Sequence, residues 1–151
     1  MSNLLLTVTL FTPLLGALIV YIFGRDEKKA KILAILASLI PFFTSLLLLA
    51  NYKWGTSDLQ FVEKIPWIKD FGISYFLGVD GLSMPLVFLT TLLSTLTIIF
   101  SWDVKKRIRE YFALLLILET GVLGVFISLD FFLFYLFWEV VLIPMYFLIV
   151  E

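Results

Sequence analysis

One long apolar stretch, residues 131–150 (FFLFYLFWEVVLIPMYFLIV), contains a single charged side chain, Glu139. A helix of about 20 apolar residues is long enough to cross the roughly 30 Å hydrocarbon core of a bilayer. At about 1.5 Å per residue, Glu139 stands about 12 Å along such a helix, near the bilayer midplane. Placing an ionisable group there costs on the order of 2.5 to 3.5 kcal/mol, taking Asp as a proxy for Glu. The sequence therefore predicts a function for Glu139.

The composition of the whole chain agrees with a membrane protein. Of its 151 residues, 62% are hydrophobic and 15% are charged, against about 45–50% and about 25% in soluble domains. The chain has no cysteine and no histidine, which excludes thiolate-held iron–sulfur clusters, zinc–thiolate sites and the usual haem ligand within it. No phosphate-binding or dinucleotide-binding glycine motif occurs, so we expect neither a nucleotide nor a nucleic-acid partner.

Hydropathy divides the chain into five predicted transmembrane helices. We therefore expect an all-α polytopic membrane protein with one membrane domain over residues 1–151. The start of the chain lacks the basic residues of a signal peptide, so it is interpreted as a retained helix. The five helices are expected at about residues 4–23, 32–50, 84–102, 111–128 and 131–150.

Lysine and arginine are concentrated in two of the connections between these helices. The loops at residues 24–31 and 103–110 hold eight of the eleven cations, whereas the longer loop at residues 51–83 holds three. By the positive-inside rule, both dense loops are cytoplasmic. The N-terminus is then expected outside, and the loop at residues 51–83 becomes an outer loop.

The outer loop mixes aromatic residues with glycines, which predicts an ordered segment that lies along the membrane interface. Residues 65–68 and 73–79 are candidates for the two arms of a small β-hairpin that turns at residues 69–72, although their alternation is imperfect. Asp80 or Ser83 is expected to cap the third helix. The alternative for Asp80 is a role in ion entry from outside.

Two carboxylates fall at mid-span, Glu119 in the fourth predicted helix and Glu139 in the fifth. The connection between these helices is so short that they must be antiparallel neighbours, with the two carboxylates at similar depth. In a membrane, desolvation favours the neutral form of a carboxyl group and a nearby cation favours the charged form. A glutamate whose partner approaches and withdraws would therefore suit a proton relay. The alternative is a permanently protonated glutamate that only holds helices together.

Pro144 is expected to distort the fifth helix. It lacks an N–H group, so the carbonyl of Val140, next to Glu139, loses its normal helical partner. A kink and local hydration beside a carboxyl group would suit an ion path. Pro13 and Pro41 are interpreted as structural prolines.

Hydroxyl and small residues recur at helical spacing in the third and fourth helices. Such spacing lets two helix backbones approach closely, so we expect these residues to be packing positions. The alternative is a role as water ligands. The residues are Thr90, Ser94, Thr97 and Ser101 in the third helix, and Thr120, Gly124 and Ser128 in the fourth.

Three strings together resemble the N-terminal third of subunit M, also called subunit 4, of respiratory complex I. They are GISYFLGVDGLSMPLVFLT (72–90), LLLILETGVLGVFISLDFFL (114–133) and FYLFWEVVLIPMYFLI (134–149), and the resemblance extends over essentially the whole chain. It implies that Glu139 is the fifth-helix glutamate of the antiporter-like subunits, which pairs with a lysine on a seventh helix. It also implies that Glu119 is the fourth-helix glutamate often found in subunit M.

The resemblance predicts a proton-translocating membrane-arm subunit of a complex I-type NADH:quinone oxidoreductase. It implies other membrane-arm subunits and the bilayer as partners, NAD, FMN, iron–sulfur clusters and quinone in partner subunits, and the inner (plasma) membrane of a prokaryote as location. Related subunits occur in multisubunit Na⁺/H⁺ antiporters and membrane-bound hydrogenases, which are the alternative. A structural membrane scaffold is the third. Family members are much longer, so we expect the N-terminal part of a longer subunit or a split subunit.

Overall fold

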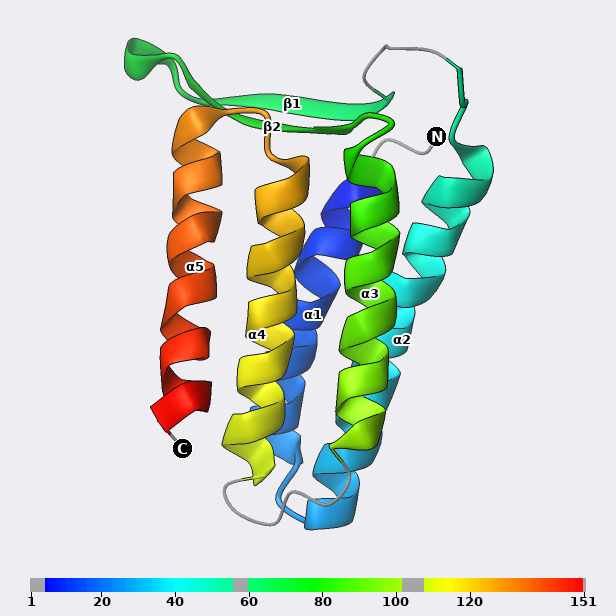
Figure 1. Ribbon diagram of the computed structural model, residues 1–151. Helices are drawn as coiled ribbons and strands as arrows, with labels where there is room; N and C mark the ends of the chain where they lie inside the picture. The colour runs from blue at the N-terminus through cyan, green and yellow to red at the C-terminus, as the bar shows by residue number, and fades with distance from the viewer. Residues whose placement is uncertain (1–4, 56–59, 102–107, 151) are drawn as a thin grey trace.

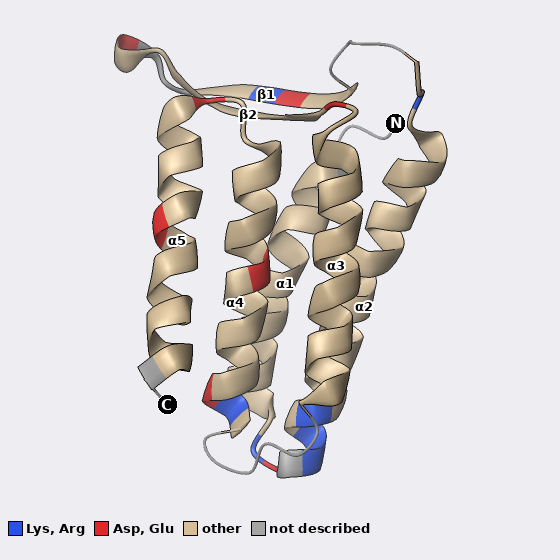
Figure 2. Ribbon diagram, in the orientation of Figure 1, with Lys and Arg blue, Asp and Glu red and all other residues tan. Residues whose placement is uncertain are grey.

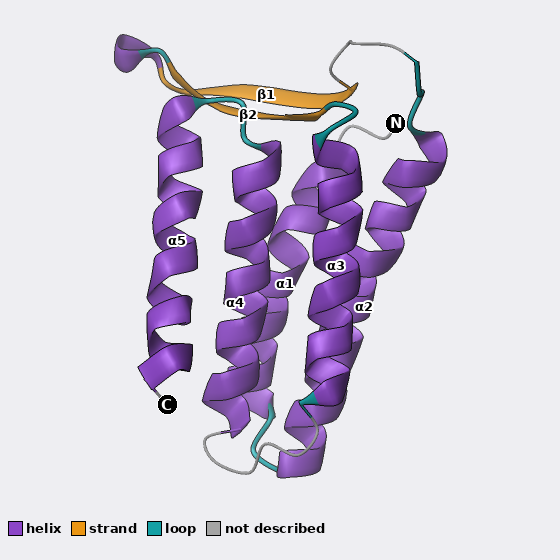
Figure 3. Ribbon diagram, viewed as in Figure 1, coloured by secondary structure: helices purple, strands orange, loops and turns teal. Residues whose placement is uncertain are grey.

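A computed structural model describes residues 5–55, 60–101 and 108–150. Five helices stand side by side, and a two-stranded antiparallel sheet lies across one end of the bundle (Figures 1 and 3). All five helices are long and apolar enough to cross a membrane. The predicted fold class is therefore confirmed. The elements are α1 (Leu5–Phe23), α2 (Glu27–Asn51), β1 (Gln60–Ile68), the 3₁₀ turn η1 (Lys69–Phe71), β2 (Ile73–Val79), α3 (Ser83–Phe100), α4 (Ile108–Ile127) and α5 (Phe131–Val150).

The helix boundaries differ from the predicted ones chiefly at the basic connections. Helix α2 begins at Glu27 rather than residue 32, and α4 begins at Ile108 rather than residue 111. Lys, Glu and Arg are good helix formers, so a helix continues past the last apolar residue when nothing stops it. The loop expected at residues 24–31 is consequently half helical. Trp102, the expected end of the third helix, lies outside the described residues.

Helix α5 stands at one side of the bundle and packs against α4, whereas α4 also contacts α1, α2 and α3 (Figure 1). The two helices differ accordingly in burial. In the candidate membrane span of α4, 50% of the residues are buried within the structure, whereas in that of α5 only 17% are buried. Most of the α5 surface is therefore not covered by the described residues.

Hydroxyl groups join neighbouring helices at buried or half-buried positions. Since lipid tails are as apolar as leucine, helix association in a membrane depends on close packing and hydrogen bonds. The bonds link α1 to α2, α2 to α3 and α4 to α1. They are Thr9 Oγ1 with Thr44 Oγ1 (2.6 Å), Ser45 Oγ with Thr91 Oγ1 (2.8 Å), and Thr120 Oγ1 donating to the carbonyl of Leu10 (2.9 Å).

Glycines allow α4 and α5 to approach closely. A Cβ atom added at Gly124 would lie 2.1 Å from Cγ of Phe137, and one at Gly121 would lie 3.0 Å from the backbone nitrogen of Val141. The first distance is shorter than real Cβ atoms show, and the second is tighter than most real Cβ contacts. The packing role predicted for Gly124 is therefore confirmed.

Helix α3 carries two stripes of hydroxyl residues, one facing α2 and one facing α4. The buried hydroxyl residues are Thr91 and Thr95, whereas Thr90 and Ser94 are half-buried and Thr97 is exposed. Thr91 faces α2 through its bond to Ser45, and Thr95 donates to the carbonyl of Ser38 in α2 at 3.3 Å. Thr90, Ser94 and Thr97 face α4 instead, across a cavity, and Ser101 Oγ lies 2.9 Å from the Tyr111 hydroxyl of α4, so close packing by this stripe stays a prediction. One residue shifts a helical position by about 100°, so the spacing alone could not say which of two adjacent stripes meets α2.

The predicted β-hairpin is confirmed and its first arm is longer than expected. Strand β1 begins at Gln60, and the register pairs Ile65 with Tyr75 and Ile68 with Ile73. Gly72 closes the turn at φ +69°, a backbone conformation that favours glycine. The register slips at two places in β1. These irregularities explain the imperfect alternation in the sequence.

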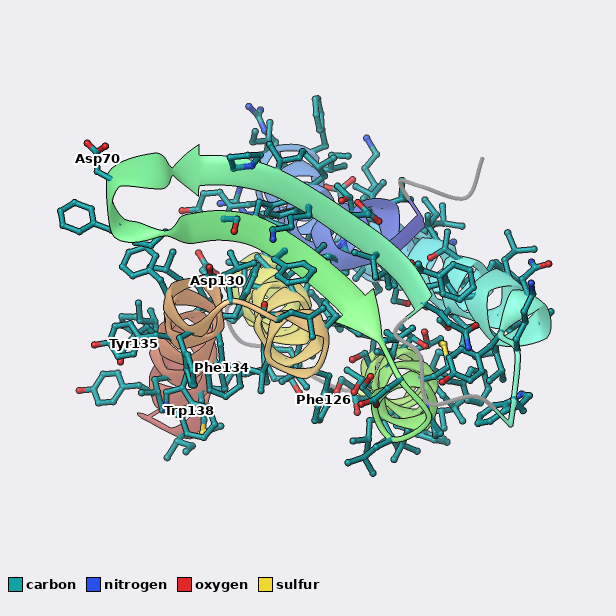
Figure 4. All side chains as sticks on the ribbon, turned by 90° about the horizontal axis from the view of Figure 1, so that it is seen from above. Asp70, Phe126, Asp130, Phe134, Tyr135 and Trp138 are labelled. Carbon is teal, nitrogen blue, oxygen red and sulfur yellow. The ribbon has the colours of Figure 1, made fainter. Side chains whose placement is uncertain are left out.

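Asp130 attaches the hairpin to the helices. Its Oδ2 accepts the Ser74 N–H of β2 at 3.0 Å, and its Oδ1 accepts the Phe132 N–H at the start of α5 at 2.9 Å. The neighbouring Leu129 N–H also bonds the Phe76 carbonyl at 2.8 Å. The backbone hydrogen bonds that the Asp130 carboxylate itself accepts, above all the bond from Ser74, lower the pKa of Asp130. Figure 4 shows Asp130 between the end of α5 and the hairpin.

The hairpin is also attached to α1. Glu63 of β1 is buried and its carboxylate accepts hydrogen bonds from the backbone N–H and the hydroxyl of Thr7, in the first turn of α1. Tyr75 of β2 lies 2.8 Å from the same hydroxyl, and burial raises the pKa of the Tyr75 phenol. A carboxylate at a helix N-terminus is favourable because free N–H groups point towards it.

Asp80 caps α3, as predicted. Its Oδ1 accepts the N–H groups of Leu82 and Ser83 at 3.0 and 2.9 Å, and the hydroxyl of Ser83 accepts the Asp80 N–H at 2.9 Å. Each of the two side chains, Asp80 and Ser83, thus accepts a hydrogen bond from the backbone N–H of the other residue. The backbone bond from Ser83 is the main reason that the pKa of Asp80 is lowered.

Charged side chains gather at the two ends of the bundle. In Figure 2, Lys and Arg are most abundant at the end opposite the hairpin. Arg109 lies there, where its guanidinium donates to the Tyr21 carbonyl at 3.0 Å and stacks over the Tyr21 ring. Lys105, Lys106 and Arg107 of the second basic loop lie outside the described residues. That the N-terminus lies on the outer side of the membrane stays a prediction.

Candidate functional site

Glu139 lies on the outer side of α5, away from α4. The buried side chains of α5 are Leu133, Phe137 and Pro144, which share one face of the helix. At about 100° per residue, Glu139 lies roughly 150° around the helix from the centre of that face. Tyr135, one turn earlier, is 57% exposed and points away from α4 in Figure 4. The carboxyl group is therefore half-buried on a face that the described residues leave uncovered.

The surroundings of Glu139 at its own depth are apolar and aromatic. Exposed neighbours on the same face are Leu142 and Tyr146, three and seven residues further along. Residues 32–50, 84–100, 111–127 and 131–150 contain neither Lys nor Arg. Within the described helices, Glu139 thus has no cation at its depth, and any such partner must come from elsewhere.

Glu119 occupies a different environment, at mid-height of α4 (Figure 2). Its side chain is 2% exposed, and among the described residues neither carboxyl oxygen has a hydrogen-bond partner. It lines a cavity of about 250 Å³ between α3 and α4, together with Thr90, Ser94 and Thr97 of α3. The carboxyl group is therefore directed to α3.

The structure does not bring the two glutamates together. Helices α4 and α5 are antiparallel neighbours, as predicted, but they meet through Gly121 and Gly124. Glu119 lies on the α3 side of this contact and Glu139 on the outer side of α5. Two separate carboxyl sites at similar depth result, rather than one carboxylate pair.

Pro144 lies in the middle of a helix that continues to Val150. Pro144 and Val140 both line a cavity of about 710 Å³ between α1, α4 and α5 beneath the hairpin. Its walls are apolar apart from Thr120 and Tyr75, and Glu139 is not among them. The expected hydration of the carboxyl group beside Pro144 therefore finds no support in this arrangement.

Potential metal ligands are not clustered in the part of the chain that the structure describes. In the described ranges no three His, Cys, Asp or Glu residues come close enough together to hold a metal ion. The sequence supplies neither thiolate nor imidazole, the ligands that iron–sulfur clusters and haem require.

Two carboxylates with structural roles were missed in the sequence, Asp130 and Glu63. Asp130 stands directly before a long apolar run, which is a recognisable N-cap signal. Glu63 gave no such signal because its partner, Thr7, is 56 residues away. Only the folded hairpin brings the two together.

The fold and the site together define a multi-pass membrane protein with carboxyl groups at mid-helix. The family described as "NADH-ubiquinone oxidoreductase chain 4, amino terminus" matches residues 5–129. The chain belongs to this family. Glu119 lies within the matched residues. Glu139 lies ten residues beyond the last matched residue, in a part of the chain that the relatives described below also cover.

Individual relatives extend the match to nearly the whole chain. The chain is 44% identical to NADH-quinone oxidoreductase subunit M of Rhodobacter capsulatus over 99% of its own length and 30% of that protein's. It is 32% identical to F(420)H(2) dehydrogenase subunit M of Methanosarcina mazei over 95% of its length and 29% of that protein's. The chain thus spans about 30% of the length of these relatives.

Solved structures show the same fold. A chain of respiratory complex I from Thermus thermophilus superposes with a TM-score of 0.76 at 24% identity, over 92% of this chain and 27% of that one. A chain of an archaeal membrane-bound sulfane sulfur reductase superposes with a TM-score of 0.75 at 19% identity, over 93% and 22%. The same fold therefore occurs in chains of two different respiratory membrane complexes.

Proposed function

We propose that this chain is the N-terminal part of a proton-translocating membrane-arm subunit of a complex I-type NADH:quinone oxidoreductase, in which Glu139 carries the proton. Membership of the subunit family supports the assignment. The observation that carries it is the position of Glu139, a carboxyl group at mid-helix on a face that the described residues leave uncovered. An ionisable residue in a membrane span is expected to face protein or water rather than lipid.

The uncovered face of α5 requires a partner surface. A charged carboxylate in the membrane is stabilised by an approaching cation, and the neutral acid is favoured when the cation withdraws. We propose that this cation is the lysine of a later helix in a longer subunit. The chain matches about 30% of the length of its relatives, which leaves room for such a helix in them. Glu139 would then bind and release a proton as that pair closes and opens.

The redox chemistry would belong to partner subunits. NAD, FMN, iron–sulfur clusters and quinone would be bound there, and free energy from electron transfer would reach Glu139 through contacts along the membrane arm. We place the assembly in the inner (plasma) membrane of a prokaryote, with the N-terminus of this chain outside. The segregation of basic residues to one end supports this orientation.

A second candidate is the same ion-translocating role in an assembly with other electron partners. The match to F(420)H(2) dehydrogenase subunit M favours it, because the same part of the chain occurs there with a different named donor. Which redox subunits co-purify with the protein separates the two. If the protein were part of a stand-alone Na⁺/H⁺ antiporter, no redox subunit would co-purify with it.

The proposed function is tested by Glu139→Gln in the full-length subunit within the assembled complex. Proton pumping into inverted membrane vesicles is followed with a pH-sensitive dye, and electron transfer is measured on the same vesicles. We expect pumping to be strongly reduced, because an amide cannot carry the proton. The matched control is Glu110→Gln, which removes the same charge at the end of α4 opposite the hairpin. Normal assembly with undiminished pumping in Glu139→Gln would contradict the relay.

A further inference from the structure

The side of α4 that faces α3 contains a carboxyl group with unsatisfied hydrogen-bonding capacity. Glu119 is 2% exposed, and both of its carboxyl oxygens lack a partner among the described residues. Buried polar atoms are nearly always paired with protein or ordered water. Leaving one unpaired costs about 1–3 kcal/mol. A group of this kind indicates that Glu119 binds a partner other than the described residues.

The cavity beside Glu119 has the chemistry of a water site. It measures about 250 Å³, and a water molecule occupies about 30 Å³ in the liquid and needs two to four polar partners. Three hydroxyl residues of α3 line it opposite the carboxyl group: Thr90, Ser94 and Thr97. The Thr90 hydroxyl donates to the carbonyl of Leu86 at 2.7 Å, which leaves its oxygen free to accept a bond from water.

The charge environment favours a bound proton over a charged carboxylate. Helix α3 has no Asp, Glu, Lys or Arg between residues 83 and 100. Among the other elements around α4, Lys28, Lys29 and Lys31 lie in the first turns of α2, while Glu139 faces outward from α5. The phenols of α1 and β2, Tyr21 and Tyr75, are bound at opposite ends of the bundle. Within the described part, no charged group therefore faces Glu119 at its depth, and an isolated charge there would be costly.

We propose that Glu119 and the hydroxyl groups of Thr90, Ser94 and Thr97 form a water-holding proton site between α3 and α4, separate from the site at Glu139. The protonated carboxyl group donates to water, and the hydroxyl groups of α3 hold that water in place. These three residues line the cavity towards α4, whereas Thr91 and Thr95 make the contact with α2. The inference rests on the proposed function, because a buried proton site is useful in a subunit that moves protons.

The first test locates the water by X-ray radiolytic footprinting of the full-length protein in its native membrane, with oxidised side chains identified by mass spectrometry. Hydroxyl radicals made from bound water oxidise the side chains beside it. We expect oxidation of Leu118 and Val122, which line the cavity, at rates several-fold above that of Leu123, a fully buried residue of the same helix outside the cavity lining. Equal rates would show an apolar or lipid-filled cavity and would overturn the proposal.

The second test assigns the water to the hydroxyl groups of α3. The triple variant Thr90→Val, Ser94→Ala, Thr97→Val is expected to lower oxidation of Leu118 and Val122 to the rate of Leu123. The matched control is Thr91→Val, which removes a hydroxyl from the face of α3 that bonds Ser45 in α2, and should leave the footprint unchanged. If the triple variant does not assemble, Ser94→Ala alone replaces it, with a smaller decrease. An unchanged footprint in these variants would overturn the role of the hydroxyl groups.

The proton itself is detected by infrared spectroscopy. The protonated carboxyl band that is lost in Glu119→Gln should shift when wild-type membranes are moved from H₂O to D₂O. In the α3 hydroxyl variants we expect this shift to be about tenfold slower, a factor that corresponds to about 1.4 kcal/mol. A band that never exchanges, or no such band, would overturn the proposal. These readouts do not measure pumping, so their failure is distinguishable from failure of the relay at Glu139.

Discussion

At Asp130 one carboxylate connects the hairpin, the turn after α4 and the start of α5. Its oxygens accept the backbone N–H groups of Ser74, Phe132 and Leu133. These bonds lower the pKa of Asp130. A group whose pKa is lower in the folded state adds stability above its unfolded pKa of about 3.9, and that stability is lost as the pH falls through the folded pKa. Acid is therefore expected to loosen the hairpin.

The change that tests this joint is Asp130→Ala. Loss of an N-cap carboxylate costs about 0.5–2 kcal/mol, so we expect faster hydrogen–deuterium exchange in the hairpin peptides at neutral pH. The difference between wild type and variant should shrink only as the pH falls below the ordinary Asp pKa of about 3.9 and through the lowered pKa of folded Asp130, where the wild-type carboxylate also becomes protonated. Equal exchange at neutral pH would show that Asp130 does not hold the hairpin.

Gly124 makes a second prediction at the scale of one residue. Because an added Cβ would lie 2.1 Å from the Phe137 ring, we expect Gly124→Ala to destabilise the α4–α5 contact by about 1–3 kcal/mol. Loss of folded protein during titration with denaturing detergent measures this. Gly81→Ala is the control, since its Cβ would meet nothing closer than 3.8 Å. Combining Gly124→Ala with Phe137→Leu should restore part of the loss, and no rescue would argue against a steric cause.

Among the helices, α1 and α4 are joined by the bond from Thr120 to the Leu10 carbonyl. We expect Thr120→Val to cost only about 0.6 kcal/mol, the average for hydrogen bonds between membrane helices. The shape of the side chain is kept, so packing should be unaffected. The same detergent titration measures the loss. A loss of several kcal/mol would mean that the hydroxyl has a role beyond joining these two helices.

The elements that the sequence predicts best are those whose signal is local. Helix α5 begins at the predicted residue because Asp130, directly before its apolar run, accepts the N–H groups of Phe132 and Leu133. The cap at Asp80 and the turn at Gly72 follow from their immediate neighbours. The first residues of α2 were missed because no local signal stops a helix among lysines.

The orientation of side chains between elements could not be predicted. The separate faces of Glu119 and Glu139 depend on how α3, α4 and α5 pack, which no local signal in the sequence reports. The same holds for the hydroxyl residues of α3, where a one-residue difference separates Thr90 from Thr91. Contacts such as Glu63 with Thr7 depend on chain segments far apart in the sequence.

For the whole molecule, the main prediction concerns its direction in the membrane. These 151 residues contain no cysteine, so a single cysteine introduced here adds a label that the parent protein, measured in parallel, lacks. Asp70→Cys at the tip of the hairpin should react with a membrane-impermeant maleimide from outside (Figure 4). Lys28→Cys, in the first turn of α2, should react only after the membrane is opened. The reverse pattern would show that the N-terminus is inside.

The proposed function depends on Glu139 changing its protonation while electrons flow. Infrared difference spectroscopy of the assembled complex, recorded during turnover against rest, measures this change directly. We expect a protonated-carboxyl band that appears or disappears during turnover in wild type and in Glu110→Gln, and that is missing in Glu139→Gln. A Glu139 band that stays constant through turnover and across pH would contradict the relay and would identify the protein as a structural scaffold of the membrane arm.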